Sequence, residues 1–241
     1  MDVLVVGASG ATGSLLVEQL LNRGSGVRAI VRSEGSLPKR LREHAGLSVI
    51  EANILDLEAS DLARHVKGCR AVASCLGHNL SFSGIFGSPR QLVTDATRRL
   101  CAAIEINGPV EPVKFVLMNT TGNSNRDLDE PVSLAQRAVI TLLRLCLPPH
   151  RDNEDAADYL RTQVGQGNAV IQWAVVRPDG LTDEASVSAT TVHPSPTRSA
   201  IFDAGKTSRI NVASFMADLI GDDSAWSQWQ GKMPVIYNET A

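Results

Sequence analysis

Residues 1–13 read Met-Asp-Val-Leu-Val-Val-Gly-Ala-Ser-Gly-Ala-Thr-Gly, an apolar run followed by a glycine at every third position from 7 to 13. This order predicts a strand, a tight turn and a helix, which continues at helical spacing through residues 15–20. We expect Gly7 to adopt a backbone angle closed to residues with a Cβ atom, Gly10 to leave room for a pyrophosphate, and Gly13 to let the helix pack closely on the strand. The free N–H groups of the first helical turn would face the phosphates. The stretch therefore predicts a dinucleotide-binding turn rather than a tight turn alone, with cofactor-binding residues Gly7, Ser9, Gly10, Ala11, Thr12 and Gly13.

Strand-like apolar runs recur after this turn, and helix-like segments separate them. The runs are residues 27–31, 47–50, 71–76, 113–118 and 170–176. This alternation predicts an α/β fold, a Rossmann-type doubly wound parallel sheet with helices on both faces. No linker-like stretch divides the chain, so we expect a single domain over residues 1–241.

Capping patterns predict where several helices begin and end. Ser88 followed by Pro89 predicts the start of a helix that ends near residue 106. Pro148 and Pro149 end a helix over residues 134–147, and Asp152, with Asp155 as its capping-box partner, is expected to start the next. The pattern loosens at residues 182–208, which we expect to be a loop with at most one short strand, a C-terminal substrate cover. A helix over 211–220 and a strand over 233–237 are expected to follow.

The amino-acid composition limits which binding partners and which cellular compartment we expect. The net charge of −3 and the pI near 6.0 give no sign of a nucleic-acid-binding surface. No stretch approaches the ~20 apolar residues of a membrane span, and the first apolar run is too short for a signal peptide. The cysteines at 69, 75, 101 and 146 form no Cys-x-x-Cys pair, so we expect no metal site. Cys75 and Cys146 lie in apolar runs and are expected to be reduced core residues of a cytoplasmic protein.

The end of the second expected strand favours one dinucleotide over another. Arg32 and Ser33 stand about 20 residues past the glycine turn, where an NAD-specific protein has an acidic residue for the ribose hydroxyls. A guanidinium beside a hydroxyl suits a 2′-phosphate, so the sequence favours NADP(H). The alternative is that Arg32 is a surface residue.

Later strand ends supply further candidates. Asn53 lies where a loop would contact the adenine, although it is equally suited to closing a turn. Gly77 would let the backbone lie alongside the cofactor. His78 follows it and is expected to point toward the crevice at the carboxyl ends of the strands.

With these pieces assembled, the chain resembles the short-chain dehydrogenase/reductase superfamily, in its atypical branch of NmrA-like proteins and small flavin and biliverdin reductases. The likeness spans nearly the whole length. It rests on the glycine turn and on the stretches Asn119-Thr-Thr121, Asp155-Ala-Ala-Asp-Tyr-Leu-Arg161, Trp173-Ala-Val-Val-Arg-Pro-Asp-Gly-Leu181 and Ser208-Arg-Ile-Asn-Val-Ala-Ser-Phe215. The resemblance implies bound NADP(H), with the nicotinamide near the ends of strands four to six and the Arg177-Pro178 turn beside that ring.

One departure from the superfamily bears on the chemistry. Most members have a catalytic tyrosine with a lysine four residues later, whereas here Gln163 follows Tyr159 and Ala241 follows Tyr237. Asn153 stands where the atypical branch often has a lysine. Alcohol and ketone chemistry through a tyrosinate is therefore disfavoured.

What remains is hydride transfer to an acceptor that needs little help with protons. We expect an NADP(H)-dependent oxidoreductase acting on a small, planar flavin, quinone or enone. The alternative is a non-catalytic NADP(H)-binding regulator that acts through a protein partner. Residues 80–87 place two phenylalanines either against a planar substrate or in the core. The expected catalytic residues are Thr120, His78 and Asn119, and Thr121, His150 and Asn153 are further polar candidates.

Overall fold

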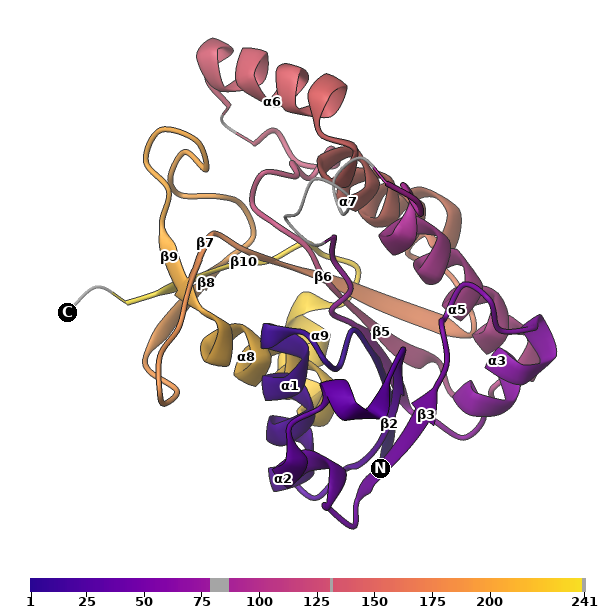
Figure 1. Cartoon of the computed structure of the whole chain (residues 1–241). Helices are drawn as coiled ribbons and strands as arrows, with labels where there is room; N and C mark the ends of the chain where they lie inside the picture. Colours follow the sequence, from indigo (N-terminus) through magenta and orange to yellow (C-terminus); the bar gives the residue numbers. More distant parts are fainter. Residues whose placement is uncertain (79–86, 131, 240–241) are drawn as a thin grey trace.

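The computed structural model describes residues 1–78, 87–130 and 132–239. Its main sheet has eight strands, and every neighbouring pair is parallel except the last (Figure 1). In spatial order the strands are β3 (Leu47–Glu51), β2 (Gly26–Val31), β1 (Asp2–Val6), β4 (Ala71–Ser74), β5 (Val113–Met118), β6 (Ile171–Pro178), β10 (Val235–Asn238) and β8 (Thr190–His193). The order reverses beside β1, as in a doubly wound Rossmann-type sheet, so the predicted fold is confirmed.

Helices cover both faces of the sheet (Figure 1). One face packs against α1 (Ala11–Asn22), α2 (Lys39–Arg42), α8 (Arg209–Gly221) and α9 (Asp223–Trp229). The other face packs against α3 (Ala59–Val66), α5 (Leu92–Asn107), α7 (Pro148–Tyr159) and the π-helical turn η2 (Leu160–Val164). The alternating side chains of β1 explain both layers, because Val3 and Val5 enter the first core and Leu4 and Val6 the second.

Two helix starts differ from the prediction. The helix expected at Ser88-Pro89 begins at Leu92, and the helix expected at Asp152 begins at Pro148. Proline at a first helical position has no N–H to leave unpaired, so the prolines that end α6 (Leu134–Cys146) also begin α7. Asp152 therefore lies inside α7 and not at its cap, and its side chain is available for other contacts.

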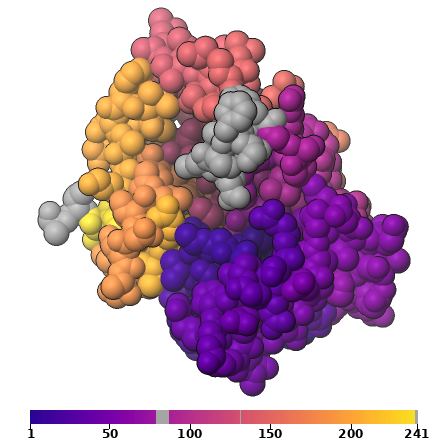
Figure 2. Space-filling view, in the orientation of Figure 1, coloured from indigo at the N-terminus to yellow at the C-terminus, as the bar shows by residue number. Residues whose placement is uncertain are grey.

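The C-terminal part also holds more regular structure than expected. Strands β7 (Gly180–Thr182) and β9 (Lys206–Ser208) form a separate parallel pair, and β8 joins the main sheet beside β10. Segment 182–208 thus contains both β8 and β9, whose three or four residues are too short to give a periodic pattern. In Figure 2 this orange segment stands beside the indigo N-terminal part.

The surface of α6 corrects one cysteine assignment. Cys146 is exposed, as are Leu134, Leu142 and Leu145 along the same helix. The other cysteines are buried or partly buried, and burial raises the pKa of the Cys75 thiol to about 12. Within the described residues, none of the helices is both long and apolar enough to span a membrane.

Candidate dinucleotide-binding site

The glycine turn has the close approaches that its sequence predicts. Gly7 has a φ of +74°, and a Cβ on it would lie 2.5 Å from the backbone of Cys75. A Cβ on Gly13 would lie 2.1 Å from the carbonyl oxygen of Gly7, so strand and helix touch there through backbone alone. Gly10 is the N-cap of α1, with a φ of −73° that any residue can adopt, and no side chain caps the helix within the described residues. The first N–H groups of α1 therefore remain available for an anionic ligand.

A cleft of 340 Å³ opens in front of this turn, across the carboxyl ends of β1, β2 and β4. Of the predicted cofactor-binding residues, Gly7, Ser9, Gly10, Arg32, Asn53 and Gly77 line it. The remaining lining residues are mostly apolar: Val6, Ile30, Val31, Ala52, Ile54, Cys75, Leu76, Pro89 and Leu92. Ala11, Thr12 and Gly13 begin the helix behind the turn and do not line the cleft. The start of α1 can bind an anionic group, and the apolar slot beside it can hold a planar ring.

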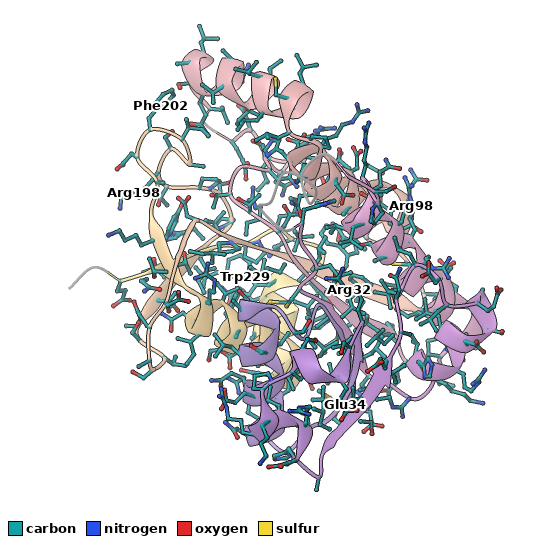
Figure 3. The ribbon with its side chains drawn as sticks, viewed as in Figure 1. Arg32, Glu34, Arg98, Arg198, Phe202 and Trp229 are labelled. Carbon is teal, nitrogen blue, oxygen red and sulfur yellow. The ribbon has the colours of Figure 1, made fainter. Side chains whose placement is uncertain are left out.

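Arg32 follows β2 on the rim of the cleft. Its side chain is exposed, and it makes no ion pair with any residue that the structure describes. Figure 3 labels Arg32 near the middle of the molecule in this view and Glu34 below it. The neighbouring carboxylate of Glu51 accepts the backbone N–H of Glu34 at 2.8 Å. The cation at the rim is therefore not neutralised by an acid from β3.

Asn53 closes a turn at the edge of the cleft, and its contact with the adenine stays a prediction. It lines the cleft, and its amide also closes a turn, because Nδ2 donates to Oδ2 of Asp56 at 2.9 Å and Oδ1 accepts the N–H of Leu55 at 3.3 Å. The turn fixes the orientation of the amide at the edge of the cleft.

The side chain of Arg177, at the end of β6, is held inside the protein. Its side chain is fully buried, and Nη2 lies 2.7 Å from Oε1 of Glu130. The other guanidinium N–H groups donate to carbonyl oxygens of Met233, Asn123 and Pro194. Neither Arg177 nor Pro178 lines the cleft, and the contact of this turn with the nicotinamide stays a prediction. The side chain instead ties the segment before α6 to the end of β6.

The end of β5 holds the other predicted catalytic residues, outside the lining of the cleft. Asn119 is buried, and its Nδ2 donates to the carbonyl of Asn153 in α7 at 2.8 Å, while its Oδ1 accepts the N–H of Thr120 at 2.9 Å. Thr120 is half-buried, and its Oγ1 accepts the N–H of Gly122 at 3.3 Å. Asn119 thus fixes the strand end to α7, and the hydroxyl of Thr120 lies on the adjoining turn.

His78 contacts α7 through Asp152, the residue that the sequence analysis expected at the start of a helix. Its Nε2 lies 2.7 Å from Oδ2 of Asp152, whose carboxylate also accepts the N–H groups of Val93 and Thr94 at the start of α5. Asp152 is fully buried, so these partners are what compensate its lost hydration. The sequence could not indicate this role, because His78 and Asp152 are 74 positions apart.

A second buried acid, two residues further along α7, was also missed. Both oxygens of Glu154 accept from Arg144, at 2.7 and 2.9 Å, and His150 Nε2 lies 3.4 Å from Oε1. Burial opposes ionisation of Glu154, but the adjoining His150 and Arg144 lower its pKa to about 2. The one signal in the sequence was the spacing of His150 and Glu154 by one helical turn.

Tyr159 packs rather than facing the cleft. It lies against the core beneath α5 and α7, and the guanidinium carbon of Arg98 is 5.7 Å from its ring centroid. Burial raises the pKa of its hydroxyl. The aromatic pair predicted in residues 80–87, Phe82 and Phe86, lies outside the described residues.

A glycine turn between β1 and an uncapped α1, opening on a cleft across parallel strand ends, defines a dinucleotide-binding protein of the Rossmann type. The chain belongs to the NAD(P)H-binding family, whose model matches residues 7–223. A search of curated proteins found no match.

Solved structures share this fold at low sequence identity. The oxidoreductase ylbE from Lactococcus lactis has a TM-score of 0.70 and 17% identity, with 100% of this chain and 92% of that one covered. A short-chain dehydrogenase/reductase from Veillonella parvula, in complex with NADP, has a TM-score of 0.70 and 15% identity over 98% and 94% of the chains. ChuY, an anaerobillin reductase from Escherichia coli O157:H7, has a TM-score of 0.69 and 19% identity over 100% and 98%.

Proposed function

We propose that this protein is an NADP(H)-dependent reductase that transfers a hydride to a small, planar acceptor such as a flavin, quinone or enone. The observation that carries the choice of NADP(H) is Arg32, an exposed cation on the rim of the cleft without an acidic partner in the described chain. A 2′-phosphate would accept charge-assisted hydrogen bonds from this guanidinium. Relatives of the same fold include one in complex with NADP and one named as a reductase, which support the proposal.

The cofactor would be held in two places. The N–H groups at the start of α1 would receive the pyrophosphate beside Gly10, and Asn53 would lie at the adenine. When bound, NADPH would supply the hydride. The nicotinamide end would then lie past Gly77, toward the ends of β4 and β5.

Residues at those strand ends would serve the acceptor. Thr120 would hydrogen-bond to it, while Asn119 and His78 would position the strand ends through their contacts with α7. Segment 182–208 would cover the acceptor from the C-terminal side. In this proposal the protein works in the cytoplasm on a small molecule, with no nucleic-acid or membrane partner.

Anaerobic turnover of NADPH with a panel of flavins, quinones and enones tests the proposal. We expect consumption of NADPH with at least one planar acceptor, and less with NADH. Binding of NADPH without turnover of any acceptor would contradict a reductase, and would favour the non-catalytic regulator with a protein partner. Thr120→Val and His78→Gln should lower turnover by a larger factor than they weaken NADPH binding.

A further inference from the structure

The first turn of α7 lies against the end of β5. A Cβ built on Gly122 would lie 3.4 Å from Cε1 of His150, 3.8 Å from its Nδ1 and 3.7 Å from Oγ1 of Thr120. The Nδ1 side of the imidazole and the Thr120 hydroxyl therefore both lie beside Gly122. The side chain of His150 is 11% exposed, so the ring is largely buried but keeps some contact with solvent.

The opposite edge of the ring faces an ionised carboxylate. His150 Nε2 lies 3.4 Å from Oε1 of Glu154, which is held in place by two hydrogen bonds from Arg144. This carboxylate lies on the Nε2 side of the ring, so the Nδ1 side is the one left toward the turn at Gly122.

Two contacts tie this part of α7 to the strand ends where the proposed function puts the nicotinamide. The carbonyl of Asn153 accepts from Asn119 at the end of β5, and Asp152 holds His78, which directly follows the cleft residue Gly77. Residues on both sides of His150 along the helix are thus tied to the carboxyl ends of β4 and β5. The adenosine half of the cleft, at Arg32 and Asn53, is formed by other strand ends.

We propose that His150 donates the proton that accompanies hydride transfer, and that Glu154 positions its ring. The inference rests on the proposed reductase function. The acceptor gains a hydride from NADPH, the electron pair of its conjugated double bond moves to a nitrogen or oxygen atom, and that atom takes the proton from Nδ1 of His150. The products are NADP⁺ and the reduced acceptor, and the imidazole regains a proton from solvent. His150 would thus take the role that a tyrosine with a lysine has in related enzymes.

His78 is less suited to this role. Its Nε2 is paired with Asp152, and that carboxylate is also fixed by two backbone N–H groups of α5. A proton shared in this way stabilises the junction of three segments. The geometry therefore assigns His78 to positioning and His150 to proton transfer.

The test compares His150→Gln with His65→Gln, a histidine on α3 outside the site. For each variant we would measure NADPH affinity by fluorescence titration, and the single-turnover rate of hydride transfer to the best acceptor of the panel. His150→Gln should lower the rate by about 100-fold, the size of a general-acid contribution, and leave NADPH affinity within about 2-fold. His65→Gln should change neither. A His150→Ala variant should regain part of the rate when imidazole is added.

Glu154 acts through His150, so its variants need a different readout. Glu154→Gln should lower kcat while KM for the acceptor stays the same, and Glu154→Asp, which keeps the charge, should restore part of the loss. Wild-type turnover that persists in His150→Gln, or an inactive and folded His150→Ala that imidazole does not rescue, overturns the assignment of His150. A wild-type protein that binds NADPH and reduces no acceptor overturns the proposed function, and this inference with it.

Discussion

Oε1 of Glu130 lies 2.7 Å from Nη2 of Arg177, and neither side chain is more than 3% exposed. Glu130 also accepts the N–H of Asn125, so one acid joins the end of β6 to the segment before α6. A guanidinium left in this place without its carboxylate would be a buried, uncompensated charge.

Glu130→Ala should therefore lower the free energy of unfolding by about 3–5 kcal/mol, measured by urea denaturation. Asp203→Ala, which removes the carboxylate of the solvent-exposed pair with Arg198, is the control and should change stability far less. A Glu130→Ala protein as stable as the control variant would contradict this account of the buried pair.

Arg32→Ala tests the choice of cofactor. Wild type should bind NADPH at least about 10-fold more tightly than NADH, because one charge-assisted contact contributes about 1.5–3 kcal/mol. The variant should lose this preference because its affinity for NADPH falls while its affinity for NADH stays the same. Titration of both cofactors measures the effect, and Arg42→Ala, an exposed arginine of α2 away from the cleft, is the matched control. Equal wild-type affinities for the two cofactors would show that Arg32 is only a surface residue.

Gly10→Val should abolish cofactor binding in a folded protein. The φ of −73° accommodates valine, but the side chain would start 3.2 Å from the carbonyl of Gly7 and extend where the pyrophosphate is expected. Calorimetry measures binding, and circular dichroism reports folding. Gly167→Val, at a glycine with no atom near its Cβ position, should bind like wild type. Binding retained by folded Gly10→Val would place the phosphates elsewhere.

Tyr159→Phe should keep most of the reductase activity. Its hydroxyl has a raised pKa because of burial, and the ring packs beside Arg98, so loss of the oxygen removes no acid from the cleft. Turnover with the best acceptor is compared with wild type at equal NADPH saturation. A loss of about 100-fold with intact NADPH binding would restore the tyrosine as general acid.

Glu154 should make the free energy of unfolding depend on pH in the acidic range. Its pKa falls from 4.5 to about 2 in the folded protein, so its contribution is complete above pH 4.5 and is lost as the pH falls through 2. The contribution is on the order of 3 kcal/mol. Urea unfolding at a series of pH values should show this slope in wild type and a flatter one in Glu154→Gln. Identical slopes would mean that the carboxylate titrates normally.

Much of the fold follows from local patterns. The glycine turn and the strand at Val113–Met118 are where the sequence placed them, because buried parallel strands are continuous apolar runs. Helix α9 was missed because its seven residues are too few for a clear period. The exposed Cys146 was misjudged because an apolar run does not reveal which side of a helix is covered.

The candidate site, like the fold, could be predicted from the sequence only in part. The cleft follows from the strand ends, which a parallel sheet brings to one edge. The contacts of Asp152 with His78, of Glu154 with Arg144 and of Arg177 with Glu130 do not, because each joins two different segments, and a single sequence carries no sign of such a pairing. The capping interpretation of Asp152 failed for this reason: the acid caps a helix, but that helix is α5.

The described lining of the cleft comes entirely from residues 6–92, whereas Thr120 and His150, which are proposed to contact the acceptor, come later in the chain. The two halves of the proposed reaction are thus encoded by consecutive stretches of the chain, joined by α5 and β5. Recombination between relatives within that connection would exchange the acceptor side as a block and keep the nucleotide side intact. Under the proposed function, such a layout would let relatives diversify in the molecule they reduce while their source of electrons stays constant.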